Sequence, residues 1–233
     1  MISVIVPAHN EEHLIGATLS ALTASVRGLL EPVEIIVVDD ASTDRTREVV
    51  RDAGVRLLSV NLRQIAAVRN AGAAGSRGER LLFVDADTIV NPKVAHAAVR
   101  AMHDGAVGGG ATVLWEGTLP AWARVLASVT RWTMRFGNLA AGCFVFVTRA
   151  AFEAVGGFDP RLYATEEIAL SRALRRIGRF VVLPEHVVTS GRKLRTHSVV
   201  EILRMTAGVS RRGTAAFRDR SNLSLWYGDR RNE

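Results

Sequence analysis

Short apolar runs alternate with amphipathic helical periods in the part of the chain before Gly105. The expected strands are Ser3–Ala8, Val33–Asp39, Val55–Val60 and Arg80–Asp85. The expected helices are Glu12–Arg27, Asp44–Ala53, Ile65–Ser76 and Pro92–His103. Because such alternation is typical of a parallel sheet wrapped by helices, the pattern predicts an α/β fold with a mostly parallel central sheet.

The pattern is less regular in the second half of the chain. Further strands are expected at Ala106–Trp115, Cys143–Thr148 and 186–191, the first with flexible glycines at 108–110, and further helices at Pro120–Phe136, Thr165–Ile177 and Ser198–Ser210. No stretch has the composition of an interdomain linker. We therefore predict one domain over residues 1–210, with halves of about 1–105 and 106–210, and a basic tail over 211–233.

Composition fits a single globular domain. The chain has 233 residues, of which 48% are hydrophobic and 23% charged, and no apolar run approaches the roughly 20 residues that cross a bilayer. The first residues are interpreted as a strand and not as a signal peptide. Cys143 is the one cysteine, so a disulfide framework is excluded and a reducing, cytoplasmic location is expected.

Positive charge is concentrated near the end of the sequence. Residues 171–233 contain 14 Lys and Arg against 5 Asp and Glu, a net +9, whereas the whole chain carries +7. This asymmetry favours attraction to phosphates, in a nucleotide or on an anionic lipid surface. No recognised nucleic-acid module accompanies it, so no nucleic-acid partner is predicted.

Aspartates follow two of the expected strands. Asp39 and Asp40 end the second strand, and Asp85 and Asp87 follow the fourth. Ligands of open parallel sheets bind beyond the carboxyl ends of the strands, so these four carboxylates are expected on one rim. Such a cluster needs a cation, and carboxylate oxygens favour Mg²⁺ or Mn²⁺. The alternative is that each Asp is only a turn former or a helix cap.

Five motifs occur in an order that resembles a known family. They are SVIVPAHNEE, EIIVVDDASTD, AAVRNAG, LLFVDADT and GGFDPRLYATEE. Together they resemble the motifs of family-2 glycosyltransferases, over roughly residues 2–195. The resemblance implies a single GT-A (Rossmann-like) domain, with a nucleotide-sugar-binding half followed by an acceptor half. It also implies metal-dependent transfer of a sugar from a nucleotide-diphosphate donor to an acceptor hydroxyl, with inversion.

The resemblance also implies a donor site. Asp87 would bind the metal, and Asp85 would contact the ribose or the metal. Asp40 would bind the base or the ribose, and Arg69 would counter phosphate or carboxylate charge. The full donor-binding set is Pro7, Ala8, Glu11, Glu12, Asp40, Arg69, Asn70, Asp85, Ala86, Arg192 and Lys193, with the last two over the diphosphate.

A base must take the proton of the acceptor hydroxyl. Relatives carry an acidic pair at the start of a helix, and Glu167 takes the place of the usual catalytic aspartate, with Glu166 as the rival candidate. Thr165 would cap this helix, and the helix dipole would keep the carboxylate ionised. Gly142, Gly157 and Asp159 are the expected acceptor residues. Cys143 is expected to be a small buried residue, and His186 is a weaker candidate for a further metal ligand.

Two other functions fit part of the pattern. A sugar-phosphate nucleotidyltransferase would carry a glycine-rich loop after the first strand, where this chain has PAHNEEH. A non-catalytic nucleotide-sugar-binding or membrane-surface module fits Glu167 in place of aspartate and Ala169 in place of a further acid. The resemblance leaves the expected acceptor open among a glycan, a lipid and a small molecule. The helix over 120–136 and the basic end of the chain would suit peripheral docking on the anionic inner face of a membrane.

Overall fold

The computed structural model describes residues 1–117, 122, 124, 137 and 139–192. Its strands are β1 (Ile2–Ala8), β2 (Val33–Asp40), β3 (Arg56–Val60), β4 (Arg80–Val84), β5 (Thr88–Ile89), β6 (Ala106–Glu116), β7 (Phe144–Thr148) and β8 (Arg179–Ser190). Its helices are α1 (Ile15–Ser25), α2 (Thr46–Asp52), α3 (Ile65–Ala74), α4 (Pro92–His103), α6 (Arg149–Ala154) and α7 (Glu166–Ile177). The helix expected at 198–210, Lys193 and the tail over 211–233 lie outside the described residues, as does the helix expected at 120–136 apart from residues 122 and 124.

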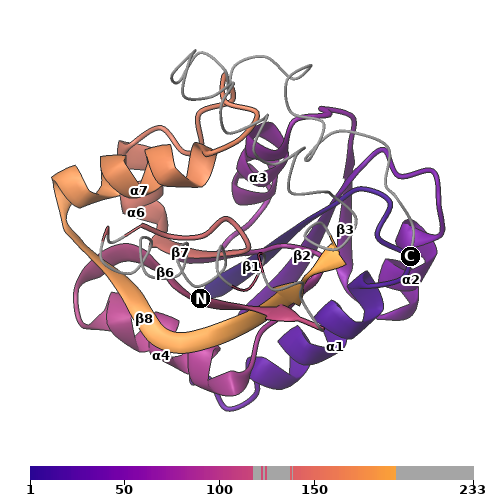
Figure 1. Ribbon diagram of the computed structural model, residues 1–233, viewed down its shortest axis with the longest axis horizontal. Helices are drawn as coiled ribbons and strands as arrows, with labels where there is room; N and C mark the ends of the chain where they lie inside the picture. Colours follow the sequence, from indigo (N-terminus) through magenta and orange to yellow (C-terminus); the bar gives the residue numbers. More distant parts are fainter. Residues whose placement is uncertain (118–121, 123, 125–136, 138, 193–233) are drawn as a thin grey trace.

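The strands form one open sheet between layers of helices (Figure 1). Their order is β3-β2-β1-β4-β7-β6-β8-β5. The pairs β3–β2, β2–β1, β1–β4 and β6–β8 are parallel, and the pairs β4–β7, β7–β6 and β8–β5 are antiparallel. The α/β class and the largely parallel sheet are therefore confirmed. The strands β3, β2, β1 and β4 form a parallel half, and β7, β6, β8 and β5 form a mixed half.

Each face of the sheet has its own apolar core. Side chains alternate across β1, so that Val4 and Val6 pack under α1 and α4, whereas Ile5 packs under α3 and the aromatic residues of the other face. Phe83, Phe152 and Phe158 form an aromatic cluster on that second face, with ring centroids 5.0–5.7 Å apart. This cluster holds the segment after α6 against the end of β4, which positions the candidate site.

Several predictions of elements need correction. The short helix α6 and the two-residue strand β5 were not expected, and β8 begins at Arg179, well before residue 186. Gly108–Gly110 are part of β6 and are not a flexible segment. A Cβ atom at Gly109 would collide with the Val181 carbonyl and the Phe146 ring, so glycine there permits close strand packing.

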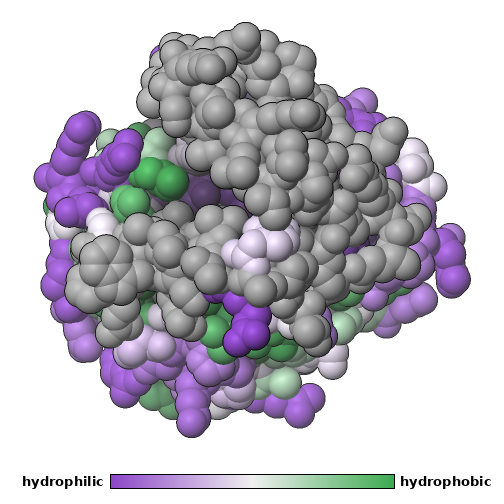
Figure 2. Space-filling model, in the orientation of Figure 1, coloured by the Kyte–Doolittle hydropathy of each residue, from purple (hydrophilic) through white to green (hydrophobic). Residues whose placement is uncertain are grey.

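The described surface is mainly hydrophilic around its rim in the view of Figure 2. Leu30, Leu62 and Ile177 are exposed large hydrophobic residues, and they lie on separate parts of the fold. Scattered apolar residues of this kind are normal on a globular protein. No helix among the described residues is long and apolar enough to cross a membrane.

Candidate active site

Asp85 and Asp87 lie in the turn that joins β4 to β5. The Asp85 N–H donates to the Cys143 carbonyl at 3.1 Å, which ties this turn to the loop before β7. The Asp87 carboxylate accepts from the hydroxyl of Thr189, on β8, at 3.2 Å. The two aspartates therefore sit between the parallel half and the mixed half of the sheet.

Arg69, on α3, supplies the positive charge that faces Asp85. Its Nη1 donates to Glu166 at 2.6 Å, and its Nη2 donates to Asp85 at 2.8 Å and to the carbonyl of Gly142 at 3.0 Å. Only 2% of the residue is exposed. Burial by itself would lower the pKa of Arg69, but the nearby carboxylates outweigh it and raise this pKa, so the guanidinium stays charged.

Glu166 and Glu167 open α7 and have different environments. Glu166 is buried and accepts the ion pair from Arg69. Among the described residues, the Glu167 carboxylate has no side-chain hydrogen-bond partner, and its own backbone N–H is the donor that favours its ionised form. Burial, reinforced by the negative charge of Glu166, raises the pKa of Glu167 to about 8, and Arg69 only partly opposes this.

The prediction that the start of α7 keeps Glu167 ionised is therefore wrong, because the pKa of Glu167 is raised and not lowered. Burial and the neighbouring carboxylate prevail over the helix dipole, whose effect is commonly below about 1 kcal/mol. Thr165 occupies the N-cap position, but its side chain makes no capping hydrogen bond, and its backbone is left-handed with φ of 65°.

The four aspartates do not form the single close cluster that was predicted. The strand β1 separates β2 from β4, and Asp39 is fully buried against Arg47, with Nε at 2.5 Å from Oδ2. Asp40 instead faces the loop before α3, where its Oδ1 accepts from the N–H groups of Leu62 and Arg63 at 2.7 and 3.0 Å. Asp40 is thus separate from the pair at the end of β4.

The loop after β1 forms one wall beside the ends of β1 and β2. Pro7 and Ala8 end β1 and are buried. Glu11 is 8% exposed, and its Oε2 lies 3.4 Å from Nη2 of Arg192, just after β8. Glu12 accepts from the Arg45 N–H at 3.0 Å, next to the start of α2. The structure therefore brings Glu11 and Arg192 together. Glu12 instead ties the loop after β1 to the residue that precedes α2.

Asn70 has a structural task that sequence reasoning missed. Its amide donates to the Phe158 carbonyl at 2.8 Å, and its Oδ1 accepts from the Phe158 N–H at 3.0 Å. The predicted donor-binding role gains no support, because both polar atoms of the side chain already clamp the Gly157–Asp159 segment. The adjacent glycine has φ of +72°, a conformation that favours glycine.

The predicted acceptor residues are distributed around this segment. A Cβ atom built on Gly142 would lie 3.4 Å from the Glu167 carboxyl carbon, so this glycine borders the candidate base. The Asp159 carboxylate is held by Arg161, at 2.9 Å from Nε and 2.8 Å from Nη2. Gly142 is therefore next to Glu167, whereas Asp159 takes part in a surface ion pair.

Asp85 and Asp87 suit a hard divalent cation in the chemistry of their donor atoms. Within the described residues, no group of three or more His, Cys, Asp or Glu side chains converges as a complete metal site. Two carboxylates are nevertheless a common protein share for Mg²⁺, which keeps water and phosphate oxygens as its other ligands.

Neither Cys143 nor His186 adds a softer ligand. Burial, with the charges of Asp85 and Asp87, raises the pKa of the Cys143 thiol well above its usual value, so the thiol stays protonated. Cys143 is partly buried. His186 is exposed, and its carbonyl accepts from Asn91, the N-cap of α4.

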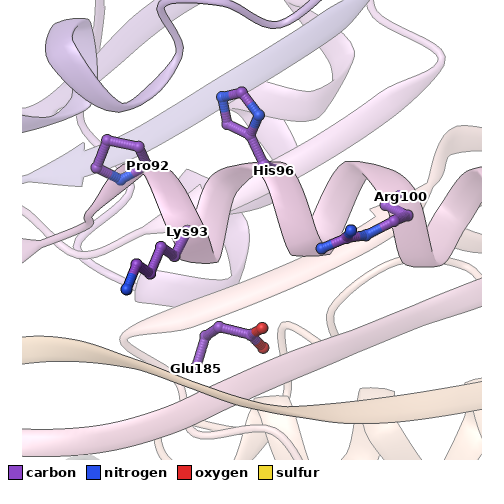
Figure 3. A pocket seen from close by; sticks show the side chains of 5 residues that line it. All are labelled: Pro92, Lys93, His96, Arg100 and Glu185. Atoms are coloured by element: carbon purple, nitrogen blue, oxygen red, sulfur yellow. The ribbon is translucent and has the colours of Figure 1, made fainter.

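A cavity of about 430 Å³ lies elsewhere, between α4 and β8 (Figure 3). Its lining residues are Pro92, Lys93, His96, Arg100 and Glu185. Figure 3 shows Glu185 extending from the strand toward the helix, between Lys93 and Arg100. None of these residues belongs to the predicted site.

Comparison with known families agrees with this arrangement. The model of the family described as "Glycosyl transferase family 2" matches residues 3–151. The chain belongs to glycosyl transferase family 2. The matched region includes Asp40, Arg69, Asp85 and Asp87, whereas the Glu166–Glu167 pair of this family-2 protein lies beyond it.

Relatives of this family-2 protein resemble it over part of their length. An undecaprenyl-phosphate 4-deoxy-4-formamido-L-arabinose transferase from Aeromonas hydrophila is 37% identical over 100 residues, which is 40% of this chain and 30% of that protein. A validoxylamine A glucosyltransferase from Streptomyces hygroscopicus is 34% identical over 107 residues, 43% of this chain and 25% of that protein. The match thus spans less than a third of each relative.

Solved structures share the fold. A mannosyltransferase from Pyrobaculum calidifontis, in complex with GDP-Man and Mn²⁺, has a TM-score of 0.68 at 20% identity, covering 93% of this chain and 62% of that one. Glucosyl-3-phosphoglycerate synthase from Mycobacterium tuberculosis, in complex with Mn²⁺ and UDP, has a TM-score of 0.63 at 22% identity, covering 94% and 79%. The single GT-A-like domain with an open mixed sheet is therefore confirmed.

Proposed function

We propose that the protein transfers a sugar from a nucleoside-diphosphate donor to an acceptor hydroxyl, in a metal-dependent, inverting reaction with Glu167 as the base. One observation carries this proposal. Arg69 bonds both Asp85 and Glu166, so the acids that follow β4 and the acids that open α7 belong to one site. Family membership favours this function over a sugar-phosphate nucleotidyltransferase.

The donor would lie along the carboxyl ends of β1, β2 and β4. Asp40 is suited to the base or the ribose, because backbone N–H groups fix its Oδ1 and leave Oδ2 to accept from a ligand. Pro7, Ala8 and Glu11 would line the same end. Arg192 would lie over the diphosphate, since a guanidinium suits phosphate oxygens.

Asp87 and the second oxygen of Asp85 would hold Mg²⁺ or Mn²⁺, with Ala86 between them. When bound, the ion would supply Lewis-acid stabilisation of the negative charge on the departing diphosphate. The Mn²⁺ complexes of the Pyrobaculum and Mycobacterium proteins support a divalent ion in this fold. The protein's own contribution is to keep Asp85 fixed through Arg69.

Glu167 is the better candidate for the base. Its carboxylate would accept the proton of the acceptor hydroxyl as that oxygen attacks the anomeric carbon and the bond to the diphosphate oxygen breaks. A raised pKa brings the base closer to the working pH, which makes proton transfer more efficient. Glu166 is engaged by Arg69 and is less available. Gly142, Gly157 and Asp159 would border the acceptor.

Substitution of the two glutamates tests this assignment. We expect Glu167→Gln to lower kcat by about 100- to 10,000-fold while the affinity for a nucleoside diphosphate with Mn²⁺ is retained. Glu167→Asp, which restores the family's usual residue, should keep part of the activity. A wild-type rate in Glu167→Gln would contradict the assignment, and normal donor binding without any turnover in the wild type would favour a non-catalytic module.

The donor nucleotide can be found by thermal unfolding with UDP, GDP or dTDP, each with and without Mn²⁺, because a bound ligand raises the apparent stability. One relative is named for undecaprenyl phosphate and another for validoxylamine A, so lipid and soluble acceptors should both be assayed. Peripheral docking on an anionic inner membrane face stays a prediction, since the helix over 120–136 and residues 193–233 lie outside the described structure.

A further inference from the structure

Arg69 lies at the junction of three segments of the candidate site. It belongs to α3, and its contacts reach Asp85 after β4, Gly142 before β7 and Glu166 at the start of α7. These partners are separated from it by 16, 73 and 97 residues in the sequence. A single side chain therefore sets the spacing between the metal-side turn and the helix that carries the candidate base.

Only a guanidinium suits this position. Two of its nitrogens meet two carboxylates on different elements, and Nη2 also bonds a backbone carbonyl. A lysine ammonium is a single point of charge and cannot form the same planar, forked set of bonds. Without the cation, Glu166 would be a buried acid without a counter-charge, which is costly, and the partly exposed Asp85 would lose its ion pair.

The Phe158 ring supports one face of the Arg69 guanidinium. Its Cζ lies 5.2 Å from the centroid of the Phe158 ring, which is fully buried, a favourable cation–π distance. The next residue, Asn70, clamps the backbone of the same phenylalanine. The paired residues Arg69 and Asn70 thus hold the ring and the backbone of Phe158, respectively.

The Nε atom of Arg69 shows that the orientation of the side chain favours the two Nη bonds over the third donor. It is buried and has no hydrogen-bond partner among the described residues, although leaving a buried donor unsatisfied is costly. The guanidinium is therefore turned so that both Nη atoms reach the acids, at the expense of the third donor. This orientation indicates that Arg69 serves to hold Asp85 and Glu166.

We infer that Arg69 is a positioning residue for sugar transfer, and not a ligand of the donor as its sequence context suggests. It holds Asp85 and the start of α7 at a fixed separation, and it engages Glu166 so that Glu167 is left as the base. This inference rests on the proposed function. It predicts that Arg69 influences the chemical step more than donor binding.

Kinetics of three variants test the inference. Misplacement of reacting groups by about 1 Å can cost about 100-fold in rate, so we expect Arg69→Lys to lower kcat by roughly that factor while the KM for the donor changes by less than about 3-fold. Arg69→Ala should regain activity when guanidinium ion is added at millimolar concentration. Arg149→Lys is the matched control. Within the described residues, Arg149 bonds oxygens of Ala73, Ser76 and Gly78 and pairs with Glu153 one helical turn away, and none of these residues belongs to the candidate site.

Different outcomes would overturn the inference. A raised KM with unchanged kcat in Arg69→Lys would make Arg69 a donor ligand. Equal losses of kcat in Arg69→Lys and Arg149→Lys, without guanidinium rescue, would reduce it to a stabilising residue.

A second measurement does not depend on turnover. Cys143 is the single cysteine, it follows Gly142, and its carbonyl bonds the Asp85 N–H. Loss of the Arg69 bonds should loosen this loop, so the thiol of Arg69→Lys should react several-fold faster with a disulfide reagent than that of the wild type or of Arg149→Lys. Unchanged labelling would overturn the positioning role. A wild type that transfers no sugar would refute the proposed function, while the labelling comparison would still decide whether Arg69 holds the loop.

Discussion

Arg192 Nη2 lies 3.4 Å from Glu11 Oε2, although 181 residues separate the two in the sequence. The contact joins the segment after β8 to the loop after β1. Both residues are predicted donor ligands, and the structure brings them to one place. In the proposed function, the Arg192 guanidinium would contact the diphosphate from this position, since a guanidinium suits phosphate oxygens.

Arg192→Ala should weaken nucleoside-diphosphate binding. Loss of one charge-assisted contact to phosphate corresponds to about 1 kcal/mol, or roughly a 5-fold higher Kd. Isothermal titration of the preferred nucleotide with Mn²⁺ would measure it. Arg179→Ala is the control, because Arg179 begins the same strand and bonds the carbonyls of Ala101 and Asp104. Equal affinities of the two variants would exclude Arg192 from the donor site.

Asp40→Asn should weaken nucleotide binding more strongly. The carboxylate accepts two backbone N–H groups at 2.7 and 3.0 Å, and an amide loses the charge that strengthens these bonds and any bond to the base or the ribose. We expect a loss of about 1–3 kcal/mol in binding free energy, measured by the same titration.

Asp39→Asn is the matched control for Asp40→Asn. Asp39 is the preceding residue of the same strand, but it is fully buried against Arg47. Its substitution should lower the melting temperature and leave the nucleotide affinity near that of the wild type. If both variants lost affinity equally, the effect would come from β2 as a whole and not from a contact of Asp40.

The local pattern of the sequence was sufficient for the longer helices and strands of the first half. Pro92–His103 was predicted with its observed bounds, because Pro92 starts the helix and its apolar positions recur with a helical period. In contrast, α6 has six residues and β5 has two, too few to show a period. The position of β7 between β4 and β6 depends on antiparallel pairing, which alternation of strands and helices does not reveal.

The candidate site was predictable as a set of residues but not as a set of contacts. The Asp85–Ala86–Asp87 run and the Glu166–Glu167 pair were recognised, and Arg69 was expected to counter phosphate or carboxylate charge. Its joint contact with Asp85 and Glu166 was not predicted, because Arg69 approaches from a helix that local patterns cannot orient. The separation of Asp40 from Asp85 likewise follows from the position of β1 in the sheet.

The two glycines before Phe158 should respond differently to alanine. Both have positive φ, +79° at Gly156 and +72° at Gly157, so each alanine should cost about 1–2 kcal/mol of backbone strain. A Cβ atom at Gly157 would also lie 2.9 Å from Asn70 Oδ1 and 3.0 Å from Phe152 Cζ, whereas at Gly156 nothing lies within 4 Å. Gly157→Ala should therefore be destabilised by about a further 1–2 kcal/mol.

Thermal unfolding of the two glycine variants would measure this difference. For a chain of this size, each kcal/mol lowers Tm by about 2–4 °C, so Gly157→Ala should melt a few degrees below Gly156→Ala. Their kcat values should also differ, because the alanine Cβ at position 157 would push away Asn70 Oδ1, which bonds the Phe158 N–H. Indistinguishable melting temperatures would show that Asn70 and Phe152 move to accommodate the Cβ atom without a loss of stability.

The raised pKa of Glu167 predicts a dependence of stability on pH. An acid whose pKa is higher in the folded than in the unfolded protein binds more protons when folded, so its stabilising contribution is complete below the unfolded value of 4.5 and is lost as pH rises through about 8. At about 1.4 kcal/mol per pKa unit, the free energy of unfolding should fall by an amount on the order of 5 kcal/mol over this range. Glu167→Gln should remove most of the fall, because the amide has no proton to lose.

Urea unfolding of the wild type and Glu167→Gln between pH 5 and 9 would measure this dependence. Glu153→Gln is the control, since Glu153 lies at the exposed end of α6 and should leave the slope unchanged. If the wild type and Glu167→Gln showed parallel slopes, Glu167 would already be ionised in the folded protein at neutral pH. The base would then be ready without a raised pKa, and kcat/KM should show no increase toward pH 8.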